Sequence, residues 1–217
     1  MASGQLSRAE ALASSGYRHA CHVMLYCDTK SELFGRFPFR HIILMQMRFD
    51  GLLGFPGGLV DQSKETLEAG LSRELSEELG LAIPVTEEDL VESCFAPASP
   101  FQRSPNLILH FYVKKIEEEL VNEVERVAAS TAADHGQEVL GMVRVPLYTM
   151  RNGGGLSHFL SHSFIGNARS QLVRSLLRLD MVPAAELHKA LAASLKTQAQ
   201  SRDGLREALA LTEAHKL

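Results

Sequence analysis

Residues 57–81 read GGLVDQSKETLEAGLSRELSEELGL, and they combine a glycine pair with a strongly periodic helical pattern. It opens on a glycine pair that interrupts regular structure, and it reaches Gly80 in the position that glycine usually takes just past a helix C-terminus. Between them, leucine recurs at every fourth position, at Leu67, Leu71, Leu75 and Leu79. Residues four apart share one face of a helix, so the pattern predicts a helix over residues 64–79 that packs through its leucines.

Three glutamates, Glu74, Glu77 and Glu78, lie on this predicted helix beside its apolar face. We expect Glu78 to be partly buried, because it falls at the edge of the leucine stripe. Glutamates four apart repel each other, and the negative end of the helix dipole disfavours them further. Arg73 supplies part of the counter-charge, and hard divalent cations such as Mg²⁺ or Mn²⁺ would supply the rest, because they prefer oxygen ligands. An ordinary charged surface helix is the alternative.

The composition is that of a globular protein without a strong charge bias. Of 217 residues, 45% are hydrophobic and 22% are charged, and the formal net charge is -4. A chain of this length can bury a full core, and its net charge argues against a polycationic surface for nucleic acid. No run of about 18 apolar residues predicts a membrane span, and the N-terminus lacks the apolar segment of a signal peptide.

Cys21, Cys27 and Cys94 are an odd number of cysteines without the spacing of a metal site. They indicate a reducing compartment and argue against a zinc centre. We expect them to be buried as small hydrophobic residues.

The rest of the sequence alternates irregularly between strand and helix patterns. Strands are predicted at residues 17–26, 41–49, 52–55, 90–96, 106–114 and 138–145. Helices are predicted at 6–14, 116–129, 167–179 and, with a break near Asp203-Gly204, in the tail 184–217. A hairpin is predicted at Asp50-Gly51, and loops at 29–40, 97–105 and 146–155. This order favours an α/β (α+β) fold with a mixed sheet between helices.

The glycine pair and the helix resemble the Nudix box, whose pattern is G-x5-E-x7-R-E-U-x-E-E-x-G-U with U aliphatic. The chain offers Gly58, Glu65 and then Arg73 to Leu81, and the match from Glu65 onward is complete. Six residues instead of five separate Gly58 from Glu65, so the shape of that loop stays open. The resemblance implies a Nudix fold, with a mixed β-sheet sandwiched between α-helices.

Blocks outside the box resemble one branch of the Nudix hydrolases, which decaps small nucleolar RNA in the nucleus and hydrolyses inosine diphosphates. The blocks include RHACH, FDGLLGFPGG, DHGQEVLG and SFIGNARSQL, and together the matching blocks cover roughly residues 17–175. The resemblance implies a Nudix domain, which we expect over residues 1–180. The tail lies beyond the resemblance, and its amphipathic pattern predicts that residues 181–217 are a C-terminal helical extension of the same domain.

In such enzymes, water attacks a phosphoanhydride phosphorus while two or three divalent ions neutralise the charge of the transition state. The resemblance implies Mg²⁺ or Mn²⁺, with Co²⁺ as a further candidate, held by Glu74, Glu77, Glu78 and the backbone carbonyl of Gly57. Glu77 and Glu78 would also be catalytic, together with Arg73, which would orient the helix carboxylates.

Residues outside the box complete the implied site. Glu138 is the candidate for a further metal ligand or general base, with an exposed strand-end glutamate as the alternative. His22, Arg48, Phe55 and Gln171 would surround the base and phosphates of the substrate, since they offer an imidazole, a guanidinium, an aromatic ring and an amide. Plain structural roles for the first three, a sheet histidine, a surface charge and a core ring, are the alternatives.

The resemblance implies capped RNA and purine nucleoside diphosphates as substrates, no membrane, and a location in the nucleolus and nucleoplasm, with the cytoplasm in addition. A Nudix hydrolase of another nucleoside diphosphate derivative, such as ADP-ribose, is the alternative among enzymes. A non-catalytic RNA-binding module is the alternative from another class, and the intact box glutamates argue against it. Apolar periodicity in residues 167–179 and in the tail further predicts a homodimer.

Overall fold

The computed structural model describes residues 4–96 and 106–213. Its strands are β1 Gln5–Leu6, β2 Arg18–Asp28, β3 Glu32–Leu33, β4 Phe37–Pro38, β5 His41–Arg48, β6 Leu53–Gly54, β7 Gly57–Val60, β8 Leu90–Phe95, β9 Leu107–Lys115 and β10 Val139–Arg144. Its helices are α1 Arg8–Ala13, α2 Leu67–Leu79, the 3-10 turn η1 Glu87–Asp89, α3 Glu118–Ala128, α4 Leu156–Ser161, α5 Ala168–Arg178 and α6 Ala184–Glu213. The predicted loop 97–105 lies outside the described residues.

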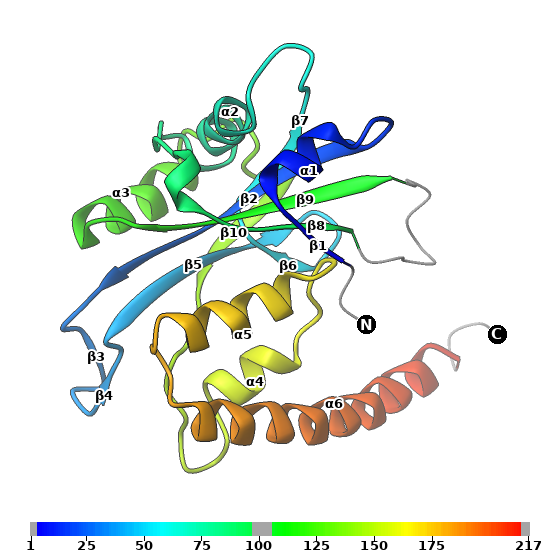
Figure 1. Cartoon of the computed structure of the whole chain (residues 1–217). Helices are drawn as coiled ribbons and strands as arrows, with labels where there is room; N and C mark the ends of the chain where they lie inside the picture. The colour runs from blue at the N-terminus through cyan, green and yellow to red at the C-terminus, as the bar shows by residue number, and fades with distance from the viewer. Residues whose placement is uncertain (1–3, 97–105, 214–217) are drawn as a thin grey trace.

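A large mixed sheet separates two groups of helices, as predicted (Figure 1). α2 and α3 cover one face of the sheet, and α4, α5 and α6 lie on the other. The hydrogen-bonded order is β1-β8-β9-β2-β5-β10, with β6 paired to β5 and β7 paired to β2. The glycine pair lies inside strand β7, beside the central strand β2, so the expectation that it interrupts regular structure is wrong.

β2 is the strand that brings the box glycines to the sheet. It runs parallel to β9 and antiparallel to β7, with His22 opposite Gly57 and Cys21 opposite Gly58. Further along, β2 pairs with β5, which ends at the hairpin predicted for Asp50-Gly51. This register places His22, a predicted substrate residue, directly beside a predicted metal-site glycine.

The predicted helices and long strands are present, with differences at their ends. The box helix begins at Leu67 instead of residue 64, because the Thr66 hydroxyl accepts a hydrogen bond from the Ala69 amide at 3.2 Å and caps it. The short pair β3–β4 lies in the region predicted as the loop 29–40, and α4 follows the predicted loop 146–155 without having been predicted. The expected break near Asp203-Gly204 is wrong, because α6 continues through it. A single glycine costs a helix only about 1 kcal/mol relative to alanine, which does not end it.

Each face of the sheet carries its own hydrophobic core. The leucines Leu67, Leu71, Leu75 and Leu79 are all at most 2% exposed, and they pack with α3 and the sheet in the first core. α5 and the start of α6 supply the second core, including Leu172, Leu176, Leu187 and Ala190. The three cysteines are buried and free, as expected.

Two histidines are buried against each other between β2 and β9. His19 Nδ1 and His110 Nε2 lie 2.9 Å apart, and His110 Nδ1 lies 2.8 Å from the Ser93 hydroxyl. Burial, with His19 and Arg8 as smaller causes, lowers the pKa of His110 to about 4. Both imidazoles are therefore neutral in the folded protein near pH 7, since burial lowers the pKa of His19 as well.

We predict that this pair makes the protein less stable in acid. The folded-state pKa of His110 lies below the unfolded value of about 6.5, so its contribution is present above pH 6.5 and is lost as the pH falls toward 4. The loss is on the order of 3 kcal/mol, measured as the free energy of unfolding in urea at several pH values. His110→Gln should flatten the slope in this range, whereas the matched change at exposed His188, H188Q, should not. Equal slopes in all three proteins would contradict the prediction.

Candidate active site

The leucine face of the box helix α2 is buried in the core, so the glutamates lie on the neighbouring face of the helix. Its C-terminus ends on Gly80 with φ 71°, the left-handed conformation that glycine adopts without strain. Glu74 and Glu77 remain accessible, with side-chain exposures of 17% and 43%. Glu78 is buried more deeply than expected, at 4% exposure.

Arg73 holds the first two carboxylates of the helix. Its Nη1 donates to Glu74 at 2.8 Å and to Glu77 at 3.1 Å, while Nε and Nη2 donate to Glu65 at 3.3 and 3.0 Å. Nη2 also donates to the backbone carbonyl of Leu59 at 3.1 Å. The loop with one extra residue therefore still brings Glu65 to Arg73, and the guanidinium joins the loop, β7 and the helix.

Glu78 is held by two donors of the protein. Its Oε2 accepts from the Gly57 amide at 2.7 Å, and its Oε1 accepts from the Gln46 side-chain amide at 2.8 Å. Burial nevertheless raises the pKa of Glu78 to about 7, and burial likewise raises the pKa of Glu74. The centre thus holds carboxylates whose negative charge is incompletely compensated by the protein itself.

Neighbouring atoms leave no room for a side chain at either of the two box glycines. Gly57 has φ 125°, and a Cβ there would collide with the backbone of Cys21 and His22. Gly58 has ordinary backbone angles, but a Cβ there would collide with the carboxylate of Glu74. Glycine at these positions lets the strand approach both the neighbouring strand and the catalytic helix.

A cleft of about 920 Å³ brings together most of the predicted site residues. Its lining includes His22, Arg48, Phe55, Gly57, Glu74, Glu77, Glu78, Glu138 and Gln171. Arg73 stands behind the carboxylates and lines a neighbouring pocket instead. The volume is that of a site for a nucleotide-sized ligand, and one end of it is strongly acidic.

The cleft is also lined by polar and aromatic side chains from outside the box. Gln171, on α5, is 5% exposed, and its side-chain amide has no hydrogen-bond partner within the described part of the chain. Burial, and then nearby Arg48, lower the pKa of His22 to about 4, so its imidazole is neutral. Arg48 is paired with Asp50 at 3.2 Å. Phe55 is only 2% exposed and packs on Phe111 with ring centroids 5.0 Å apart, so much of its ring belongs to the core.

The acidic end includes a residue that the sequence reasoning missed. Asp134 lines the cleft together with exposed Glu138, and its backbone amide donates to the Glu77 carbonyl at 3.2 Å. The turn-forming sequence Asp134-His135-Gly136 just before Glu138 was the available signal. Residues 165–168, at the start of α5, also line the cleft. They belong to the block SFIGNARSQL, which carried the family resemblance, but they were not among the predicted site residues.

The donor set fits a hard divalent cation. Among residues 4–96 and 106–213, no three acidic, histidine or cysteine side chains already meet as a metal cage. The hydrogen bonds explain this arrangement, because Arg73 engages Glu74 and Glu77, while Gln46 and Gly57 engage Glu78. The side-chain donors are carboxylate oxygens, which hard divalent cations prefer. Burial is the main cause of the raised pKa of Glu74 and Glu78, so their charged forms are poorly solvated, and a bound cation would stabilise those forms.

Fold and site together define a Nudix hydrolase, an enzyme that cleaves phosphoanhydride bonds, and enzymes of this class generally use divalent metal ions. Within it, the chain belongs to the Nudt16-like family, described as U8 snoRNA-decapping enzyme-like, whose family model matches residues 19–182.

Two sequence relatives and one solved structure are similar to this chain. The chain is 50% identical over 180 residues to the U8 snoRNA-decapping enzyme of Ovis aries, covering 82% of this chain and 90% of the relative. It is 43% identical over 203 residues to the Tudor-interacting repair regulator protein of Homo sapiens, covering 93% of each. The NUDIX domain of Shewanella oneidensis NrtR, solved with ADP ribose, matches 80% of this chain and 99% of that domain with a TM-score of 0.50 at 16% identity, which shows the shared fold.

We predict that Gly58→Ala damages catalysis more than folding. The new methyl group would displace the Glu74 carboxylate, whereas the backbone angles at residue 58 suit alanine. Displacement of a catalytic group by about 1 Å costs on the order of a hundredfold in rate, so kcat for cleavage of a phosphoanhydride substrate should fall accordingly. Gly141→Ala is the matched control, because a Cβ at this strand position meets open space. Equal activity in the two variants would contradict the role assigned to Glu74.

Proposed function

We propose that this protein is a metal-dependent pyrophosphohydrolase that removes the m7G or m2,2,7G cap from small nucleolar RNA. We propose in addition that it hydrolyses inosine and deoxyinosine diphosphates to the monophosphates. The carrying observation is a single cleft that is lined by the box carboxylates, by the neutral imidazole of His22 and by the amide of Gln171, which has no hydrogen-bond partner within the described residues. Relatives that are named U8 snoRNA-decapping enzymes support the choice of substrate.

The reaction is hydrolysis of a phosphoanhydride bond. The oxygen of water forms a bond to phosphorus, the bridging P–O bond breaks, and the leaving phosphate takes the electron pair of that bond. Glu138, exposed at the acidic rim, is proposed to accept the proton of water or to act as a metal ligand. Arg73 orients Glu74 and Glu77 from behind and does not touch the substrate.

Divalent ions, Mg²⁺ or Mn²⁺ with Co²⁺ as a further candidate, would be held by Glu74, Glu77, Glu78 and the carbonyl of Gly57. They supply charge neutralisation of the phosphates and a lower pKa of bound water. The chain contributes the fixed carboxylates, since Gln46 and the Gly57 amide hold Glu78 in one orientation.

The base of the substrate is proposed to lie at the α5 end of the cleft. Gln171 can donate and accept in one plane, which suits the edge of a purine. A neutral His22 can also donate or accept a hydrogen bond. Arg48 lies close enough to His22 to lower its pKa, and its guanidinium is proposed to bind a phosphate of the substrate. Phe55 offers the edge of a packed ring as an apolar wall.

The cellular setting is part of the same proposal. Decapping of small nucleolar RNA places the protein in the nucleolus and nucleoplasm, with the cytoplasm in addition. No helix in the described part of the chain is long and apolar enough to cross a membrane. We keep residues 1–180 as the Nudix domain and residues 181–217 as its helical extension, whose first turns reach the second core.

We also propose a homodimer, but through α6 instead of through α5 and α6 together. The apolar face of α5 is mostly used in the core, where Leu172 and Leu176 are fully buried. Leu177 on α5 is 46% exposed, and the more exposed apolar residues are on α6, where Leu195 and Leu205 are 69% and 67% exposed. Pairing α6 with a second copy would remove this surface from water.

We predict that Glu78→Gln abolishes turnover of both substrates. Cap-labelled RNA, IDP, GDP and ADP-ribose would be incubated with Mg²⁺, with Mn²⁺ and with chelator. Wild type should release a capped nucleotide from RNA and IMP from IDP only with metal. Glu78→Gln should be at least roughly a hundredfold slower, because a charged oxygen ligand is lost. Glu119→Gln, the same change at an exposed site on α3, is the matched control.

Two outcomes would contradict this function. Strong preference for ADP-ribose over capped RNA would assign the protein to another class of Nudix substrate. RNA that is bound tightly but returned intact under every metal condition would mean that the cleft serves binding alone.

We predict a dimer in sedimentation equilibrium at micromolar concentration. Leu205→Glu should shift the protein toward monomer, because it places a charge in the proposed α6 interface. Lys189→Glu, an exposed change on the same helix, should leave the association unchanged. A monomeric wild type would end the proposal.

A further inference from the structure

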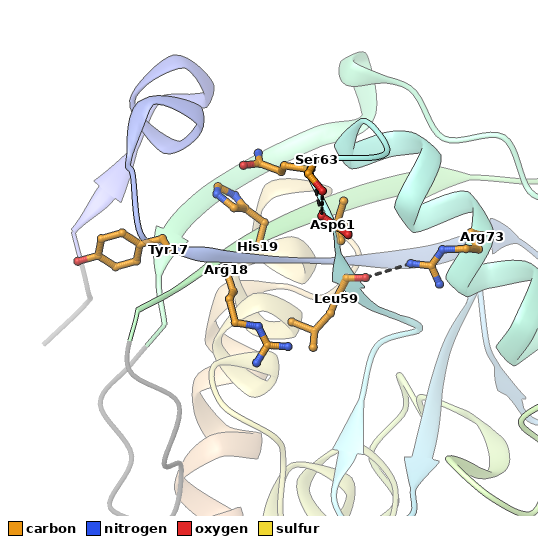
Figure 2. A pocket seen from close by; sticks show the side chains of 9 residues that line it. Tyr17, Arg18, His19, Leu59, Asp61, Ser63 and Arg73 are labelled. Carbon is orange, nitrogen blue, oxygen red and sulfur yellow. Dashed lines mark hydrogen bonds between the residues drawn. The ribbon is translucent and has the colours of Figure 1, made fainter.

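A second pocket, of about 450 Å³, adjoins the catalytic cleft (Figure 2). It is formed by the start of β2, by β7 and the loop that follows it, and by Arg73 of the box helix. Two residues, Arg18 and Leu59, line both this pocket and the cleft. The two spaces therefore meet at these two side chains, which Figure 2 shows pointing to the same side of β2.

Arg18 places an uncompensated cation at this junction. Its side chain is exposed and has no hydrogen bond or ion pair within residues 4–96 and 106–213. Successive residues of a strand point to opposite faces, so Arg18 lies on the same face as Ala20 and His22, which also line the cleft. A guanidinium in this position suits a phosphate that passes from the cleft into the pocket.

His19 supplies a buried donor on the wall of the pocket. It is 2% exposed, and its Nδ1 is paired with His110, while its Nε2 has no partner within the described residues. The buried Ser93 hydroxyl must donate its proton, and His110 Nδ1 is its only described acceptor. His110 Nε2 then donates to His19 Nδ1, and the neutral His19 keeps its proton on Nε2. The pocket thus receives an N–H donor for an oxygen or nitrogen acceptor.

The remaining wall suits a base and a ribose. Tyr17 lines the edge of the pocket, and its ring packs on Phe95 with ring centroids 5.0 Å apart. Leu59, 43% exposed, forms the ridge between the two spaces, and exposed Gln62 adds an amide. A ring, an apolar ridge and polar hydrogen-bonding groups are the elements that bind single-stranded nucleotides without strict sequence preference.

We propose that this pocket binds the first nucleoside of the RNA chain, while Arg18 binds the phosphate that connects it to the cap. The inference rests on the proposed decapping function and adds a subsite to it. Arg73 links the two spaces physically, since it donates to the Leu59 carbonyl on the ridge and to Glu74 and Glu77 in the catalytic centre. A nucleoside seated on the ridge therefore lies against the group that orients the carboxylates.

The test compares a substrate that has a chain with one that has none. KM and kcat would be measured for capped RNA and for IDP, in wild type, Tyr17→Ala and Tyr17→Phe. One base stacked on an aromatic ring contributes about 1–3 kcal/mol, so Tyr17→Ala should raise KM for capped RNA roughly tenfold or more. KM for IDP should stay within about twofold, and Tyr17→Phe, which keeps the ring, should match wild type on both substrates.

Arg18→Ala tests the phosphate contact separately. Loss of one phosphate contact should lower the slope of log KM against log salt for capped RNA by about 0.7. Arg36→Ala is the matched control, because this exposed arginine lies in the β3–β4 connection away from both spaces, and it should keep the wild-type slope.

The outcomes separate this inference from the function on which it rests. If wild type hydrolyses neither substrate, the proposed function fails and the subsite fails with it. If wild type removes caps while Tyr17→Ala and Arg18→Ala keep its KM and salt slope, the subsite alone is overturned. An equal loss on RNA and IDP in Tyr17→Ala also contradicts it, because a subsite for the chain does not act on a substrate without one.

Discussion

The bonds of Arg73 are the constraint on which the site depends. One guanidinium joins Glu65 of the loop, the Leu59 carbonyl of β7, and Glu74 and Glu77 of α2. Arg73 thereby fixes the loop, β7 and α2 relative to one another. Without it, only the leucine face of α2 would hold the helix in place. Arg73 also allows like charges to share one helix near its negative end, where isolated glutamates would repel each other. Burial also leaves the charged forms of Glu74 and Glu78 poorly solvated, which is the physical basis of the metal binding that we propose.

Much of this arrangement could be predicted from the sequence because it is local. The leucine spacing decides which face of the helix is buried, and the spacing of the glutamates then decides that they emerge together. The glycine pair signals a close approach of backbone, and the structure gives the reason in the carboxylate of Glu74 and the strand at Cys21. The resemblance to the Nudix box added the expected roles, and the cleft brings nine of the ten predicted site residues together.

What the sequence could not supply depends on contacts between distant segments. Buried Glu78 is paired with Gln46, on β5, whose side-chain amide donates to it from the face of the sheet under α2, and no local pattern in the sequence indicates such a pair. Asp134 and residues 165–168 join the cleft through the packing of loops. The second pocket arises where β2 meets the loop after β7, so its residues carry no shared motif. The continuity of α6 through Asp203-Gly204 was missed because a local breaker signal was given too much weight.

The central claim is that the box carboxylates form a cation site held in place by the protein. Titration of the purified protein with Mn²⁺, with free Mn²⁺ followed by electron paramagnetic resonance, tests it without reference to any substrate. Wild type and Glu119→Gln should bind Mn²⁺ equally, and Glu78→Gln should bind it roughly tenfold or more weakly, because an oxygen ligand is lost. Binding of equal strength in all three proteins, or none in wild type, would contradict the account.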